Sequence, residues 1–299
     1  MGNEPTYEAA GVSLATAGAV VERLRAAVES TGTEGFGTFA GLYPLDERRL
    51  LAASMDSIGT KPTVARPRGL LRNCGADMAA HCINDVATTG AEPLFLLDYV
   101  AASRLDLEEV AELVEGAAGV CRAAGCALVG GETAEMPGVY REGELDFAAT
   151  CVGLVDRADV IDGSRVQAGD WVVGFPSAGV HANGFTLVRR VLEEEDYDGP
   201  DLLAPTRLYL EEVNRLRGRA KAFAHVTGGG IAGNLERVLP AGRTAEIDWD
   251  SWKRPAVFEW LAQHVEQEEL RRVFNLGIGF CAVVDPAEAE DELVIGEIR

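Results

Sequence analysis

A chain of 299 residues, 47% of them hydrophobic, can bury one large core or two ordinary ones, and the usual domain length favours two. Its formal net charge of -21 argues against a nucleic-acid groove, because attraction to phosphate backbones needs a basic field. Its apolar stretches fall far short of the roughly 20 residues of a membrane helix. The first five residues lack the pattern of a secretory signal, so we expect a cytoplasmic enzyme that enters no membrane.

Cysteine and lysine usage gives two further expectations. Six cysteines occur without a Cys-x-x-Cys pair, several of them within apolar patterns, which predicts reduced and buried thiols. Lysine occurs only at 61, 221 and 253, so the basic residues are almost all arginine. A surface so acidic and so poor in lysine resembles proteins adapted to high salt, although an acidic protein from ordinary conditions remains the alternative.

The first half of the chain mixes helical and strand patterns. The apolar residues of 69–88 recur at spacings of three and four, which predicts a helix whose other face, with Asp77, His81 and Asp85, is expected to be solvated. Asp106 and Gly125 are typical caps for the next helix. We predict helices at 20–30, 69–88 and 106–124, strands at 50–55, 93–100, 126–129 and 145–155, and loops at 31–37 and 130–138.

The polar segment 156–169, with two glycines, marks a plausible boundary between an N-terminal domain, 1–156, and a C-terminal domain, 157–299. Beyond it we predict a strand at 171–175, a loop at 177–184, a helix at 185–194, and a second strand-loop-helix unit at 224–239. The predicted fold class is α+β (mixed α/β) in two lobes, the second a sheet covered by helices.

One short loop combines Asp56, Gly59 and Lys61, residue types that suit triphosphate binding. A carboxylate can hold a hard cation, an ammonium can meet phosphate oxygens, and glycine lets the backbone approach closely. An ordinary solvated turn would give the same spacing.

A cation site would require carboxylates from several elements to converge. Asp85 lies at the end of the predicted helix 69–88, and Glu132 and Glu135 flank Thr133 in the loop 130–138. Because Mg²⁺ takes a few oxygen ligands and keeps some waters, Asp56, Asp85 and Glu132 could form such a site. Solvated carboxylates are the alternative, and for His81 we favour an ordinary, partly buried histidine.

Two glycine-containing loops precede predicted helices. His181 belongs to the first, and Thr227, Gly228 and Gly229 belong to the second. Free N–H groups at a helix start bind phosphate even in an acidic protein, so either loop could hold a substrate phosphate. Both could also be simple tight turns, and His225 beside the second loop is read as a packing residue.

Taken together, these segments resemble the phosphoribosylformylglycinamidine cyclo-ligases, also called aminoimidazole ribonucleotide synthetases. The resemblance extends from Tyr7 to Ile298 and is most specific over 129–138. Other dense stretches are Asn84-Asp85, Gly90 to Phe95, Ser177 to Phe185, Pro205-Thr206-Arg207, Ala224 to Gly230 and Phe274-Asn275.

The resemblance implies a homodimer paired through the N-terminal lobes, with ATP and Mg²⁺ near the first lobe and formylglycinamidine ribonucleotide as the substrate. The implied reaction forms aminoimidazole ribonucleotide, ADP and phosphate. It implies catalytic roles for Asp56, Lys61, Asp85 and His181, and metal binding by Asp56, Asp85 and Glu132. Nucleotide or phosphate binding is implied for Gly35, Phe36, Gly37, Gly59, Thr60, Glu132, Thr133, Thr227, Gly228 and Gly229.

The sequence also departs from the family pattern. The motif beginning at Asp56 usually reads Asp-Gly-Val-Gly-Thr-Lys, whereas Ser57 and Ile58 stand here; His81 occupies a usually apolar position, and 284–293 is shorter than usual. The main alternative is a related enzyme that forms selenophosphate or phosphorylates thiamine phosphate. A selenium enzyme would carry an early reactive cysteine, whereas the first here is Cys74. A nucleotide-binding regulator without activity is a further alternative.

The excess of acidic residues leads to a salt prediction. Because salt screens repulsion between like charges, we expect the unfolding midpoint and the activity to rise from low to molar KCl. Thermal unfolding across a KCl series is the measurement, and a flat or falling trend would favour the ordinary acidic protein.

Overall fold

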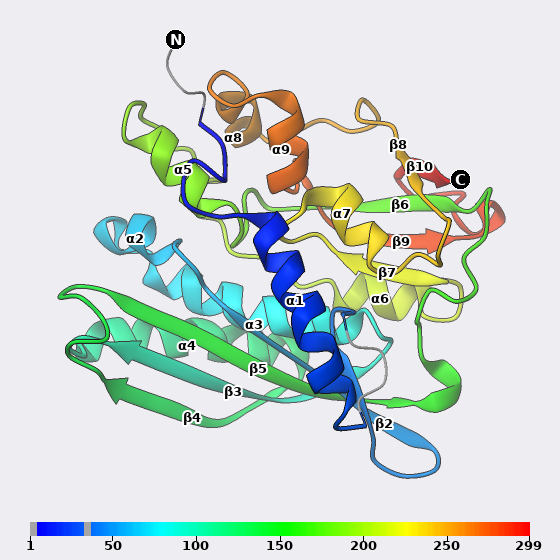
Figure 1. The fold of residues 1–299 in the computed structure, drawn as a ribbon, viewed down its shortest axis with the longest axis horizontal. Coiled ribbons are helices and arrows are strands. Elements are labelled where there is room, and N and C mark those ends of the chain that lie inside the picture. The colour runs from blue at the N-terminus through cyan, green and yellow to red at the C-terminus, as the bar shows by residue number, and fades with distance from the viewer. Residues whose placement is uncertain (1–4, 33–36) are drawn as a thin grey trace.

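The computed structural model describes residues 5–32 and 37–299, which fold into two lobes, each built on a five-stranded sheet (Figure 1). The first sheet has the order β1-β2-β5-β3-β4, in which only β3 and β4 pair in parallel. Its strands are β1 (Gly41–Pro44), β2 (Arg49–Ser57), β3 (Glu92–Ala102), β4 (Ala127–Glu135) and β5 (Leu145–Asp156). The helices of this half are α1 (Leu14–Glu29), α2 (Pro62–Ala65), α3 (Leu71–Ala87) and α4 (Leu107–Ala124).

The second sheet is antiparallel throughout and has the order β7-β9-β6-β10-β8. Its strands are β6 (Trp171–Pro176), β7 (Ala222–His225), β8 (Ala245–Ile247), β9 (Ile278–Val284) and β10 (Val294–Ile298). Every residue of β9, the strand second from the edge, is buried. The helices of this half are α5 (Phe185–Leu192), α6 (Leu210–Leu216), α7 (Gly230–Glu236), α8 (Ala256–Leu261) and α9 (Gln267–Val273).

Helix α3 lies between the first sheet and the second lobe (Figure 1). One side packs on α4, β2 and β5, while Asn73 and Asn84 donate hydrogen bonds to the carbonyls of Leu203 and Arg207. All but three of its residues are buried. Asp77, His81 and Asp85 are among the buried ones. The expectation of a solvated polar face was therefore wrong, because the second lobe covers that face.

Local signals placed most other elements correctly. Asp106 caps α4 by accepting hydrogen bonds from the backbone N–H groups of Glu108 and Glu109, and Gly125 ends the helix at φ 66°. The predicted loop 130–138 is in fact strand as far as Glu135, because its residues pair with β3. Gly131 permits that pairing, since a Cβ at this position would lie 2.1 Å from the carbonyl oxygen of Asp98.

All six cysteines are free and buried, as the sequence predicted. Five of them lie in the first half of the chain, at 74, 82, 121, 126 and 151, and Cys281 lies in β9. Burial raises the pKa of the Cys74 thiol to about 12 and raises that of Cys281 as well. No helix in the described ranges is long and apolar enough to cross a membrane.

Two glycines allow α3 and α4 to cross at backbone contact. A Cβ on Gly75 would lie 1.8 Å from the carbonyl oxygen of Leu113, and one on Gly116 would lie 2.0 Å from that of Arg72. These atoms belong to helical backbone and cannot move aside individually. The seating of α3 on α4 therefore depends on the absence of a side chain at both positions.

We expect Gly116→Ala to reduce the free energy of unfolding by about 2–3 kcal/mol, because overpacking forces the two helices apart. Gly119→Ala on the same helix is the matched control, since the nearest atom to its Cβ would be the flexible end of Arg122 at 3.9 Å. There the better helix propensity of alanine should add about 0.5–1 kcal/mol. Urea unfolding measures both, and an equal response of the two variants would contradict this account.

Candidate functional site

A buried polar cluster lies where β2 and α3 meet the second lobe. Asp85, near the end of α3, accepts a hydrogen bond from Ser54 Oγ of β2 at 2.9 Å, and its other oxygen lies 2.8 Å from His225 Nδ1 of β7. Burial raises the pKa of Asp85 to about 6 and lowers the pKa of His225 to about 3. The His225 ring is therefore neutral near pH 7, and its Nδ1–H donates to the carboxylate.

Asp56 and His81 extend this cluster. Asp56 sits near the end of β2 with its side chain 41% exposed, and one of its oxygens accepts a hydrogen bond from the Ser57 backbone N–H. Its other oxygen lies 3.2 Å from His81 Nε2, without hydrogen-bond geometry. The rings of His81 and His225 meet edge to face with centroids 4.7 Å apart. Burial lowers the pKa of His81, so its ring is neutral as well.

Lys61 is buried, and its ammonium contacts groups of the protein; the predicted phosphate contact stays a prediction. Its side chain is fully buried and forms a 2.7 Å ion pair with Asp77 of α3. The ammonium also donates to the carbonyl oxygens of His181 at 2.7 Å and Ala204 at 3.1 Å, both in the second half of the chain. Asp77 in turn accepts hydrogen bonds from the backbone N–H and hydroxyl of Thr206. The ammonium thus makes one ion pair and two hydrogen bonds within the protein.

His181 is buried and has φ 64°, a backbone conformation that is uncommon for residues other than glycine. Its Nε2 accepts hydrogen bonds from the backbone N–H groups of Ala178 at 3.1 Å and Arg207 at 3.5 Å. Burial holds its pKa well below the usual value. The ring is thus neutral with its proton on Nδ1, which has no hydrogen-bond partner among the described residues. His181 can therefore donate a hydrogen bond from Nδ1. Its Nε2 already accepts hydrogen bonds, so a general base of the reaction would be another residue.

The two predicted glycine loops are neighbours. A Cβ on Gly228 would lie 3.7 Å from Asn183 Oδ1, so the loop before α7 faces the loop before α5. Asn234 of α7 secures the former by donating to the carbonyls of Thr227, Gly228 and Gly230. Asn275 secures the latter by donating to the carbonyls of Gly179 and Val180.

The remaining predicted residues are more dispersed. Thr60 lies against α5, with its hydroxyl 3.1 Å from that of Thr186, and the adjacent Gly59 has φ 62°. Glu132 and Thr133 lie on the edge strand β4. Because β5 and β3 separate β4 from β2, Glu132 is three strand spacings from β2, roughly 14 Å. Gly37 has φ 103°, whereas Gly35 and Phe36 fall outside the described residues.

The structure therefore brings Asp56 and Asp85 to one place and leaves Glu132 apart from them. Among the described residues, no three or more His, Cys, Asp or Glu side chains lie together in a group that could hold a metal ion. The metal role of all three carboxylates stays a prediction.

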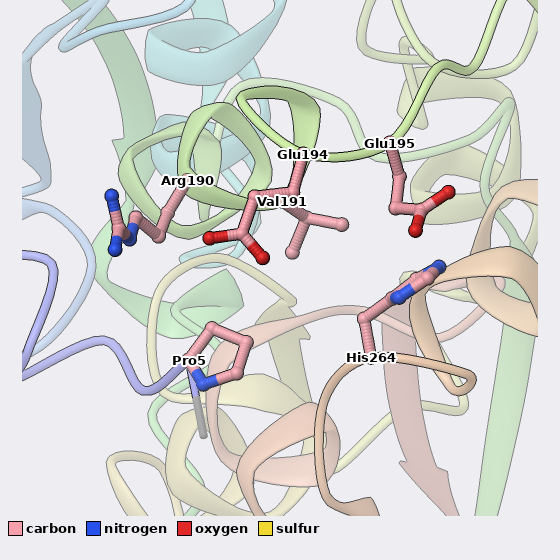
Figure 2. A pocket seen from close by; sticks show the side chains of 6 residues that line it. All are labelled: Pro5, Arg190, Val191, Glu194, Glu195 and His264. Carbon is pink, nitrogen blue, oxygen red and sulfur yellow. The ribbon is translucent and has the colours of Figure 1, made fainter. Parts of the chain in front are cut away.

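The positions of two cavities can be compared with that of the polar cluster. One of about 130 Å³ is lined by the six residues in Figure 2 and lies where the end of α5 meets His264; neither Asp56 nor Asp85 lines it. An apolar one of about 90 Å³ lies at the junction of the lobes, between Phe39, Ile161 and Phe223.

Comparison with known proteins identifies the family. Residues 37–155 match the AIR synthase related protein, N-terminal domain, and residues 167–294 match the AIR synthase related protein, C-terminal domain. A phosphoribosylformylglycinamidine cyclo-ligase from Synechococcus sp. (strain CC9605) is 46% identical over 312 aligned positions, covering 96% of this chain and 90% of the relative. The chain belongs to the phosphoribosylformylglycinamidine cyclo-ligase family.

Solved structures with other names share the fold of this cyclo-ligase family member. AaThiL complexed with AMPPCP and TMP has a TM-score of 0.67 at 16% identity and covers 92% of this chain and 89% of its own. T. maritima PurL complexed with FGAR has a TM-score of 0.65 at 17% identity and covers 88% of this chain and 44% of its own. At these identities the likeness concerns the fold alone.

Sequence reasoning missed several residues of the cluster. The sequence predicted Asp77 and His225 to be an ordinary surface residue and a packing residue, and nothing in it singled out Ser54. A warning signal existed for Asp77, because three ionisable residues on a helix with a rich apolar stripe need partners if both faces are covered. That partner, Lys61, lies far enough away in the chain that periodicity could not reveal it.

The buried ion pair gives a stability prediction. Removing one partner leaves an uncompensated charge, so Lys61→Met should cost about 3–5 kcal/mol of unfolding free energy. Asp77→Asn added to Lys61→Met should recover part of the loss. The control is Lys253→Met at an exposed position, where we expect a change within about 0.5 kcal/mol. Urea unfolding measures all three, and a small loss in Lys61→Met would show that Lys61 is not the tie described here.

Proposed function

We propose that this protein closes the imidazole ring of aminoimidazole ribonucleotide by the ATP-dependent conversion of formylglycinamidine ribonucleotide, with release of ADP and phosphate. The observation that carries the proposal is the 46% identity to a cyclo-ligase over nearly the full length of both chains. The likeness to ThiL, at 16% identity, gives no comparable support to a thiamine-phosphate kinase. We expect the reaction to take place in the cytoplasm.

The chemistry requires activation of a poor leaving group. Transfer of the γ-phosphoryl group to the formyl oxygen of the substrate would give an imidate-like phosphate ester. A neighbouring amidine nitrogen of the same molecule can then attack that carbon, and the intramolecular geometry favours closure of the five-membered ring. Phosphate leaves with the original formyl oxygen. The protein must therefore position two parts of one substrate against the end of ATP.

Asp56 is more accessible to Mg²⁺ than Asp85, because its carboxylate is partly exposed at the end of β2. Asp85 could contribute only by exchanging the hydrogen bonds from Ser54 and His225 for an ion. Mg²⁺ is usually held by one or two carboxylates together with substrate phosphates and waters, so Asp56 and Asp85 suffice for our proposal. Bound there, Mg²⁺ would offset charge on the transferring phosphoryl group.

In this proposal Lys61 contributes to the reaction through the protein rather than through the nucleotide. Its ammonium holds the backbone of His181 and so fixes the loop before α5. We propose that the Nδ1–H of His181 can then donate a hydrogen bond to the reacting groups. The glycine loops at Ser177–Gly184 and Thr227–Gly230 remain equal candidates for the substrate phosphate.

We further propose that the enzyme is a homodimer paired through the first sheet. One side of that sheet is covered by α3 and α4, while the opposite side exposes apolar residues of β2 and β3 on either side of Thr150 of β5. Met55 and Leu97 both pair with Thr150, and they are 68% and 41% exposed. A second copy of the same sheet would bury this face.

The fate of the formyl oxygen tests the proposed chemistry. We expect that formyl oxygen labelled with a heavy isotope will appear in the released phosphate when the reaction runs in ordinary water, because phosphorylation makes that oxygen part of the leaving group. Mass spectrometry of the phosphate gives the result, and hydrolysis of ATP without substrate is the control. Label recovered in water instead would mean that ATP drives only a conformational step.

A further inference from the structure

Phe39 connects the N-terminal segment with the core of the second lobe. It precedes β1, a strand of the first sheet, yet its ring is only 6% exposed and packs in the core cluster that contains Val166, Ala222 and Ile231. The chain therefore enters the first sheet from an anchor in the other lobe. Gly37, the described part of the predicted ATP-binding segment, lies two residues before this anchor.

Arg237 contacts both Phe39 and the residue before it. Its guanidinium carbon lies 3.9 Å from the centroid of the Phe39 ring, a close cation–π contact. One nitrogen donates a 3.0 Å hydrogen bond to the backbone carbonyl of Thr38. Another lies 3.4 Å from Asn234 Oδ1, the same side chain that secures the loop Thr227–Gly230. One guanidinium thus contacts two consecutive residues of the N-terminal segment and the support of a glycine loop.

The positive charge of Arg237 is attracted by two carboxylates of the cluster. Burial lowers the pKa of the guanidinium, while Asp85 and Asp56 oppose that shift by attraction. Arg237 as a residue is exposed, and arginine remains charged in proteins, so a cation is retained over the Phe39 ring. The Arg237 side chain therefore joins the N-terminal segment to the second lobe, and its charge interacts with Asp85 and Asp56.

We propose that Arg237 is a positioning residue of the cyclo-ligase reaction, which fixes Thr38 and Phe39 to the second lobe and so aligns the chain after Gly37 with Asp56 and Asp85. This inference rests on the proposed function, because it takes ATP to bind at Gly37 and the two carboxylates. Without the contact, only a fraction of molecules would hold this arrangement at any moment. The apparent affinity for ATP falls by that fraction.

We expect Arg237→Gln to raise the KM for ATP about tenfold, with kcat at saturating ATP and the KM for the ribonucleotide changed by less than about twofold. Arg237→Lys should give an intermediate rise of about threefold, because an ammonium can stay over the ring but lacks the planar fork that reaches both oxygens. A general loss of folded protein would lower the apparent kcat instead.

A double-mutant cycle distinguishes this role from independent effects. Phe39→Leu removes the ring on which Arg237 stacks, so the double variant should resemble either single variant rather than show about a hundredfold rise. Arg215→Gln is the matched control, since Arg215 also lies over an aromatic ring, that of Phe175 at 5.9 Å, elsewhere in the second lobe. Its kinetics should equal those of the wild type.

Calorimetric titration with AMPPCP keeps the inference separate from the proposed reaction, because binding needs no turnover. Weaker binding by Arg237→Gln, with an unfolding midpoint close to that of Arg215→Gln, supports the positioning role even if the wild type fails to convert the ribonucleotide. Unchanged AMPPCP affinity in folded Arg237→Gln, or additive effects in the cycle, would overturn it.

Discussion

The ion pair between Lys61 and Asp77 is the interaction on which the arrangement of the two lobes depends. It is buried on both sides, and the remaining donors of the ammonium reach two carbonyls of the second lobe. Moving two charges out of water is costly, so such a pair is sustained only when further hydrogen bonds complete it, as those from Thr206 do here. The position of the loop that carries His181 relative to the end of β2 follows from this junction.

Near that junction few side chains of the polar cluster carry a charge. The histidines of the cluster are neutral because burial outweighs their attraction to carboxylates, whereas Asp56 remains partly exposed. A chain with a net charge of -21 must meet phosphate groups through local donors. We propose that these donors are the backbone N–H groups of the glycine loops, the Nδ1–H of His181 and the guanidinium of Arg237.

Prediction from the sequence succeeded where the signal was local. The capped helix α4, the apolar stripe of α3 and the strand-loop-helix unit that ends in α7 all follow from residues close together in the chain. It failed where the outcome depended on a distant partner. The polar face of α3 is buried only because the second lobe covers it, β4 continues through two glycines only because β3 lies beside it, and the strand order that separates Glu132 from Asp56 leaves no trace in spacing.

The placement of the six buried cysteines allows local unfolding of the two lobes to be followed by thiol labelling. A thiol reacts as the thiolate, and buried thiols with raised pKa values stay inert until the surrounding structure opens. Five of these thiols belong to the first half of the chain and only Cys281 to the second lobe. Alkylation followed by peptide mapping would therefore time the unfolding of each lobe separately, with Cys281 as the sole reporter for the second.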